Sequence, residues 1–154
     1  MHRNRKKSAQ AGVAAVEFAI ALPVLMLMFL AVVEFGRAFL QYNQLTRAVQ
    51  DSARLVASEA LRGQSGTVNL DAALIATARS LVVFGNSAGT GAALLPGLVP
   101  GSVTVRDAGG GNIAVSATYL YQPMIAGGIP RMVQGGKIAT GFTLRAEVIM
   151  RAIS

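Results

Sequence analysis

The chain has 154 residues, of which 53% are hydrophobic and only 14% are charged. Four of the cations behind its net charge of +7 fall in the first twelve residues, and the mixed signs elsewhere exclude the one-sided basic patch of a nucleic-acid binder. The chain has no cysteine and a single histidine, His2, which excludes thiol nucleophiles, histidine-based triads and His/Cys metal sites in the rest of it. We therefore expect no cofactor, no metal, no catalytic residue and no enzymatic activity.

The amino-terminal third combines a basic leader, residues 1–12, with an apolar segment, residues 13–33. The apolar segment has about the 20 residues that a helix needs to cross a bilayer. It is too long for the core of a cleaved secretory signal, so we expect a retained single-pass anchor. Lysine and arginine beside a spanning segment stay in the cytoplasm, which places the amino terminus inside and the body outside. The cations that set this topology are Arg3, Arg5, Lys6 and Lys7.

Glu17 is the only charged residue of the apolar segment. An ionisable group in hydrocarbon costs about 2.5 kcal/mol or more, so such a residue normally has a partner. The alternative is that Glu17 reaches the cytoplasmic interface, since it lies near one end of the segment. Pro23 removes a helical hydrogen bond and predicts a kink or local melting there.

Helical periodicity continues through residues 34–62, which we expect to be an exported continuation of the same helix. Arg47 and Asp51 are spaced to form an ion pair one turn apart, and Gly63 is the expected helix stop. Apolar residues at spacings of three and four predict one buried stripe. Its members are Phe35, Phe39, Tyr42, Leu45, Val49, Ala53, Val56 and Ala60.

Residues 63–154 predict a small α+β head. Asn69 is the expected N-cap of an amphipathic helix that ends near Phe84, and the Gly- and Pro-rich residues 85–101 predict a loop. Alternation around the turn at 109–112 predicts a hairpin, and a last strand near 142–151 completes a three-stranded antiparallel sheet with one packed face. Tyr119 and Tyr121 are expected to pack in the core or an interface. The fold class is therefore α+β, with a long transmembrane and amphipathic helix, a small sheet and one further helix.

The start of the apolar segment has the pattern of a processing signal. A short basic leader ends in Gly12, and the fifth residue after it is Glu17, followed by Phe18. This resembles the class III signal of type IV pilins and pseudopilins. Over residues 11–60 the order of Gly12, Glu17 with Phe18, Pro23, EFGR at 34–37 and AR at 53–54 is similar to the TadE-like family, pseudopilins of the tight-adherence (Tad, or Flp) pilus.

The resemblance implies a set of partners and a location. Prepilin peptidase would cut between Gly12 and Val13 on the cytoplasmic side of the bacterial inner membrane, leaving the helix in the lipid bilayer. Glu17, with Phe18 beside it, would then act in assembly by pairing with the new amino terminus of a neighbouring pilin or pseudopilin. The other implied partner is the inner-membrane assembly platform. The expected role is a minor component in assembly or at the pilus tip, with the head periplasmic or extracellular.

Two other functions stay open at this point. One is an uncleaved single-span protein whose exported head binds envelope or surface partners. The other is an anchored enzyme, which would need converging carboxylates in a cleft.

Overall fold

The computed structural model describes residues 3–60, 68–124, 129–130, 137–138 and 141–152. The chain divides into two compact units, Met1–Arg37 and Ala38–Ser154. One long helix, two short helices and a three-stranded antiparallel sheet make up most of the described residues. The predicted α+β class is therefore confirmed.

Helix α1, Arg3–Glu59, is one uninterrupted α-helix that begins inside the leader and ends before residue 62. It continues through Pro23, so the predicted local melting is wrong. The proline removes one hydrogen bond, but the flanking residues carry enough helical bonds on both sides to hold the conformation. The expected stop at Gly63 lies outside the described residues.

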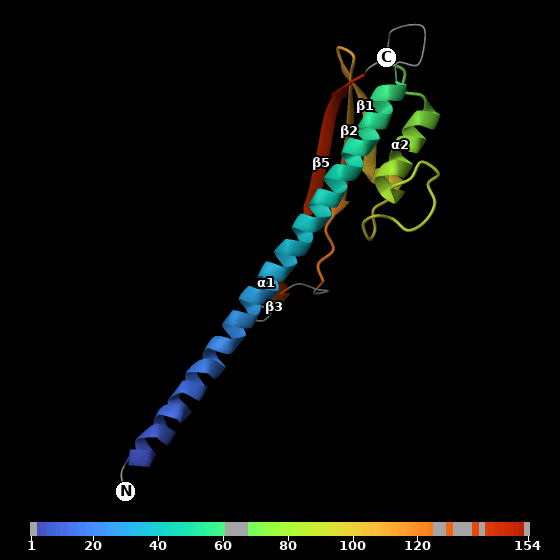
Figure 1. Ribbon diagram of the computed structural model, residues 1–154. Helices are drawn as coiled ribbons and strands as arrows, with labels where there is room; N and C mark the ends of the chain where they lie inside the picture. Colours follow the sequence, from blue (N-terminus) through green and yellow to red (C-terminus); the bar gives the residue numbers. More distant parts are fainter. Residues whose placement is uncertain (1–2, 61–67, 125–128, 131–136, 139–140, 153–154) are drawn as a thin grey trace. The chain divides into compact units, whose positions relative to one another are not determined.

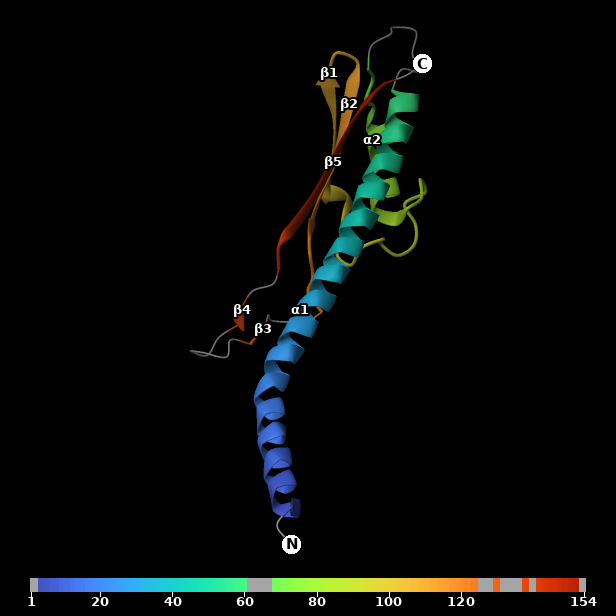
Figure 2. The ribbon, with the colours of Figure 1, turned by 60° about the vertical axis from the view of Figure 1, so that its left-hand side comes forward.

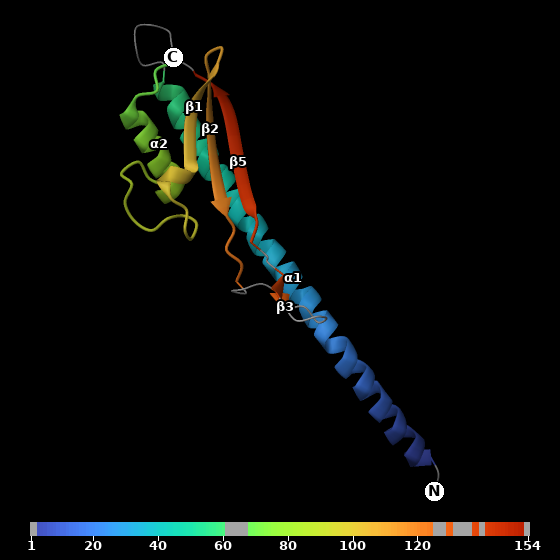
Figure 3. The same ribbon diagram turned by 180° about the vertical axis from the view of Figure 1, so that it is seen from behind.

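Within the second unit, the two longer helices lie on one face of the sheet. Figures 1 and 3 show α2, Ala72–Phe84, and the part of α1 from Ala38 onward on the same side of the strands, and Figure 2 shows the sheet nearly edge-on beside them. Ala and Val dominate the α1 side of the core, which allows close packing. The buried residues of α1 and of the turn directly after it are Ala38, Leu45, Ala48, Val49, Ser52, Ala53, Val56, Ala57 and, in the turn, Ala60.

The first three members of the predicted stripe are not in this core. Phe35, Phe39 and Tyr42 are 76%, 57% and 40% exposed. Burial in α1 begins at Ala38 and is regular only from Leu45 onward. The apolar periodicity therefore extends further along the helix than the head that covers it.

Helix α2 is fixed at both ends by local hydrogen bonds. Its N-cap is Asp71, whose carboxylate accepts from the Leu74 N–H at 2.6 Å, so the prediction of Asn69 is wrong. Both residue types cap helices, but Asp71 has the extended backbone (ψ 162°) that a cap requires. Gly85 ends the helix at φ 71°, which suits glycine, and donates to the Leu81 carbonyl.

The sheet has the order β1-β2-β5, with β1 at Val103–Gly109, β2 at Asn112–Leu120 and β5 at Thr143–Arg151. The predicted hairpin is confirmed, and the glycines at 109–111 all have positive φ in its turn. The short 3₁₀ helix η1, Pro100–Ser102, leads into β1.

Both tyrosines pack in the core, as predicted. Tyr119 donates to the Pro96 carbonyl at 3.2 Å, and Tyr121 stacks on Phe142 with ring centroids 5.0 Å apart. The connection between β2 and β5 contains a two-residue ladder between β3, Ile129–Pro130, and β4, Lys137–Ile138.

Candidate functional site

The predicted processing site lies within an exposed stretch of α1. Gly12 and Val13 follow one another in the helix, and a Cβ added at Gly12 would meet no atom within 4 Å. Gly12 does not have the positive φ that would favour glycine, and a glycine inside a helix costs about 1 kcal/mol relative to alanine. Neither packing nor backbone conformation within the folded chain therefore requires glycine at this position.

Glu17 is exposed one helical turn after Val13, and Phe18 is also exposed. Glu17 borders a shallow depression of about 420 Å³ whose other lining residues are apolar. Those residues are Ile20, Ala21, Val24 and Leu25. Within the part of the chain that the structure describes, no cation forms an ion pair with Glu17.

The helical segment around this carboxylate is apolar and exposed. Within Gly12–Glu59, the most apolar 18-residue window has a mean hydropathy of 2.6, and none of that window is buried inside the structure. This is the one helix among the described residues that is long and apolar enough to cross a membrane. A single apolar helix of this kind fits a membrane-anchored protein.

The topology residues Arg3, Arg5, Lys6 and Lys7 lie in the first turns of α1. They precede Gly12 on the same helix, so a cut after Gly12 would remove all four together. The predicted site residues therefore lie in one continuous helical segment.

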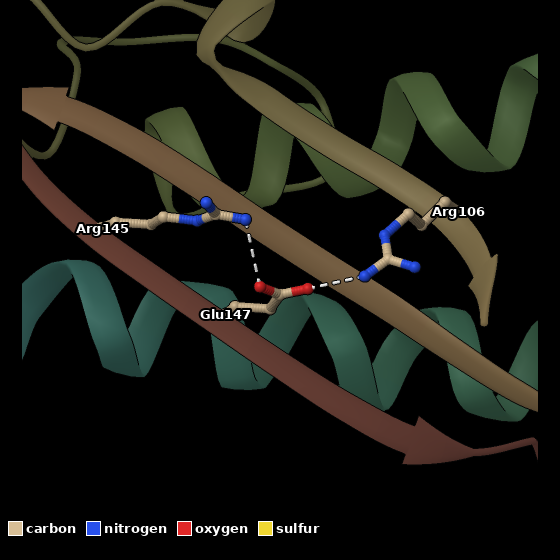
Figure 4. Close-up of polar contacts among 3 residues, drawn as sticks. All are labelled: Arg106, Arg145 and Glu147. Carbon is tan, nitrogen blue, oxygen red and sulfur yellow. Dashed lines mark hydrogen bonds and ion pairs between the residues drawn. The ribbon is translucent and has the colours of Figure 1, made fainter.

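Sequence reasoning missed a second polar cluster, on the outer face of the sheet. The Glu147 carboxylate accepts from Arg106 Nη2 at 2.8 Å and from Arg145 Nη2 at 3.2 Å (Figure 4). The hydrogen bond from Arg106 is the main cause that lowers the pKa of Glu147. Alternation along β5 placed Arg145 and Glu147 on one face, but the contribution of Arg106 depends on the register of β1.

The expected ion pair between Arg47 and Asp51 is replaced by another. Asp51 pairs with Arg54 at 3.9 Å, and both side chains are well exposed. A helix brings residues three and four apart equally close, so the spacing alone did not decide between the two arginines. Arg47 and Asp51 instead line an open groove of about 590 Å³ beside Leu81 and Leu94. An exposed pair of this kind contributes little to stability.

Comparison with known proteins bears on α1. Residues 12–54 match a family model described as TadE-like protein. The match begins at Gly12, includes Val13, Glu17 and Phe18, and lies entirely within α1. Neither curated proteins nor solved structures gave a match. The resemblance seen in the sequence is therefore confirmed, and the long helix of this chain is similar to the TadE-like family from Gly12 to Arg54.

Proposed function

We propose that this chain is a minor pseudopilin of a Tad-type pilus, cut by prepilin peptidase between Gly12 and Val13 and active in pilus assembly or at the pilus tip. The observation that carries the proposal is the TadE-like match that starts at Gly12 and runs through an apolar helix with an exposed Glu17. The family relates the chain to the Tad pilus. The role assigned here is structural and requires no catalysis by the chain itself.

The conformation of α1 at Gly12 supports a role for this glycine in processing. No contact among the described residues requires glycine at position 12, and recognition by the peptidase would give it a role. Cutting there would remove four cations and create an ammonium group at Val13. Without these charges, the end of the helix could lie deeper in the bilayer.

Glu17 would then pair with the new amino terminus of a neighbouring subunit. Inside a low-dielectric environment such a pair adds little net stability, but leaving one of its charges unpaired costs about 3–5 kcal/mol. The pair therefore selects the position of one helix against the next. Other pilins, the inner-membrane assembly platform and the lipid bilayer are the partners in this scheme.

The orientation follows from the same cations. With Arg3, Arg5, Lys6 and Lys7 retained in the cytoplasm before cleavage, the chain is a single-pass protein of the bacterial inner membrane. The second unit, Ala38–Ser154, which contains the predicted head and the exported part of α1 and is called the head from here on, is then periplasmic or extracellular.

The test compares two substitutions at one position in cells that make the pilus. Glu17→Gln keeps the size and polarity of the side chain but removes its charge, and it should leave the protein cleaved and in the membrane while abolishing piliation. Glu17→Asp keeps the charge on a shorter arm and should retain part of the piliation. Normal piliation with Glu17→Gln would refute the pairing role and favour an uncleaved or differently assembled anchor whose head binds envelope partners.

A further inference from the structure

The backbone of β5 leaves one edge of the sheet open. Tyr121 N–H donates to the Phe142 carbonyl and Ala152 N–H donates to the Gly111 carbonyl, in the same register that pairs β2 with β5 throughout. In an antiparallel ladder the hydrogen-bonded pairs alternate, so the even-numbered residues of β5 direct their N–H and C=O groups toward β2. The odd-numbered residues direct theirs away from the sheet. They are Thr143, Arg145, Glu147, Ile149 and Arg151.

None of these outward backbone groups has a hydrogen-bond partner among the described residues. All five residues are exposed. The strand is nine residues long and pairs with β2 without a register shift. It has no proline, and no charged side chain points inward from it, so it lacks several of the usual features that prevent edge pairing.

The opposite edge of the same sheet is partly occupied by a side chain of α2. Val103 in β1 pairs with Ala117, a β2 residue whose own hydrogen bonds go to β5, so the Val103 carbonyl points outward. The side chain of Arg79, on α2, donates to that carbonyl at 3.2 Å. A register shift between Asp107 and Gly109 disturbs the other end of β1. The β1 edge thus has one outward carbonyl occupied and one irregular end, whereas the described residues leave the outward groups of β5 unbonded.

The side chains of β5 indicate what kind of strand the open edge would accept. On the inner face, Leu144, Val148 and Met150 are only partly buried. Their respective β2 partners, Tyr119, Val115 and Ile113, are buried. An added strand with apolar residues on that face would complete their burial.

On the outer face, positive charge exceeds negative charge. The single carboxylate, Glu147, is already bonded to Arg106 and Arg145, and Arg151 has no ion-pair partner within the described residues. Side chains directly opposite each other on neighbouring strands favour opposite charges. A carboxylate on the added strand would therefore face an arginine.

We propose that the β5 edge of the head binds an extended segment of a partner protein as a fourth strand, with apolar residues alternating with polar ones that include a carboxylate. Main-chain hydrogen bonds to the odd-numbered residues supply affinity, and the alternating side chains supply selectivity. The inference concerns the head alone and does not depend on processing at Gly12. Pairing of β5 with β1 of a second copy would have to displace the Arg79 side chain from the Val103 carbonyl.

The test uses the full-length chain in detergent micelles and a synthetic peptide of about eight residues in which valine alternates with threonine and glutamate. Amide hydrogen exchange is followed residue by residue with and without the peptide. Binding should slow exchange at Thr143, Arg145, Glu147 and Ile149. The even-numbered amides, already bonded to β2, should not change. A matched peptide with lysine in place of glutamate should bind several-fold more weakly.

Two variants distinguish strand addition from other binding. Ile149→Pro removes an outward N–H without removing a bond to β2. It should weaken the binding of the glutamate peptide about tenfold or more. Ile149→Val keeps the N–H and should bind as the unmodified chain does. Protection of the even-numbered amides in Ile149→Pro would show that its sheet is intact. If that variant unfolds, Arg151→Glu takes its place. Arg151→Glu should reverse the preference, so that the lysine peptide binds more tightly than the glutamate peptide.

Three results would overturn the proposal. The first is the absence of alternating protection with the glutamate peptide. The second is equal binding of the lysine peptide. The third is protection of the odd-numbered amides that appears with rising protein concentration alone, which would make a second copy the occupant.

Discussion

Ser52 joins the two helices of the head, and its replacement by alanine gives a measurable prediction. Ser52 is fully buried, and its hydroxyl donates to the Ala78 carbonyl of α2 at 3.0 Å. Ser52→Ala removes this bond between elements 26 residues apart in sequence. The Ala78 carbonyl keeps its helical partner within α2, so no buried acceptor is left unbonded. The expected loss is therefore that of one net hydrogen bond, about 1 kcal/mol of the free energy of unfolding.

Ser58 provides the matched control on the same helix. Its hydroxyl also donates to a backbone carbonyl, that of Leu55 at 2.9 Å, but the residue is exposed and the bond stays within α1. Ser58→Ala should change the free energy of unfolding by about 0.5 kcal/mol or less. A larger residue at the buried position, as in Ser52→Val, should cost about 1–3 kcal/mol because it must fit where the small side chains of α1 and α2 pack closely.

The assay is denaturant unfolding of the full-length chain in mild detergent, followed by the near-ultraviolet circular dichroism of the buried tyrosines. Ser52→Ala should lower the midpoint without changing the denaturant slope. Membrane insertion and cleavage should be unaffected, because those depend on the first unit. Equal effects of Ser52→Ala and Ser58→Ala would refute the reasoning that the bond between α1 and α2 stabilises the head.

Three further predictions address the cap, the outer charges and the leader. Asp71→Ala should destabilise the head by about 1 kcal/mol and Asn69→Ala by much less, and equal losses in unfolding would contradict the assigned cap. Because the pKa of Glu147 is lowered in the fold, its ionised carboxylate stabilises the head above the unfolded pKa, and this stabilisation is lost as pH falls through the folded pKa. Glu147→Gln should therefore make the free energy of unfolding less dependent on pH in the acid range. An unchanged pH dependence would count against this. Gly12→Leu should insert into the membrane but stay uncleaved, whereas the control Ala14→Leu should be cleaved, as judged by the apparent mass on a gel. Cleavage of Gly12→Leu would contradict the role assigned to the glycine.

Much of the fold could be predicted because it follows from local periodicity. The long helix, the second helix, the hairpin and the last strand each repeat at the period of their secondary structure. Periodicity does not say how far along a helix the covering layer extends, which is why Phe35, Phe39 and Tyr42 were placed in the core. Asn69 and Asp71 are both residue types that cap helices, so the sequence alone does not say which one is the N-cap of α2. The backbone angles of the folded chain decide for Asp71.

The functional residues also fall into a group that the sequence reveals and a group that only the structure reveals. Gly12, Val13, Glu17 and Phe18 form a linear pattern within one helix, so their order in the sequence is also their order in space. The contact of Arg106 with Glu147 and the open edge of β5 depend on strand order and register. Strand order is a property of the assembled sheet, and alternation within one strand does not reveal which edge stays unpaired.

The central claim is that the chain loses its basic leader and keeps its apolar helix. The most direct measurement is the amino-terminal residue of the protein isolated from the membrane of cells with and without prepilin peptidase, determined by mass spectrometry. The account predicts that Val13 is the first residue when the peptidase is present and that the leader is retained when it is absent. An intact leader in both strains would contradict it.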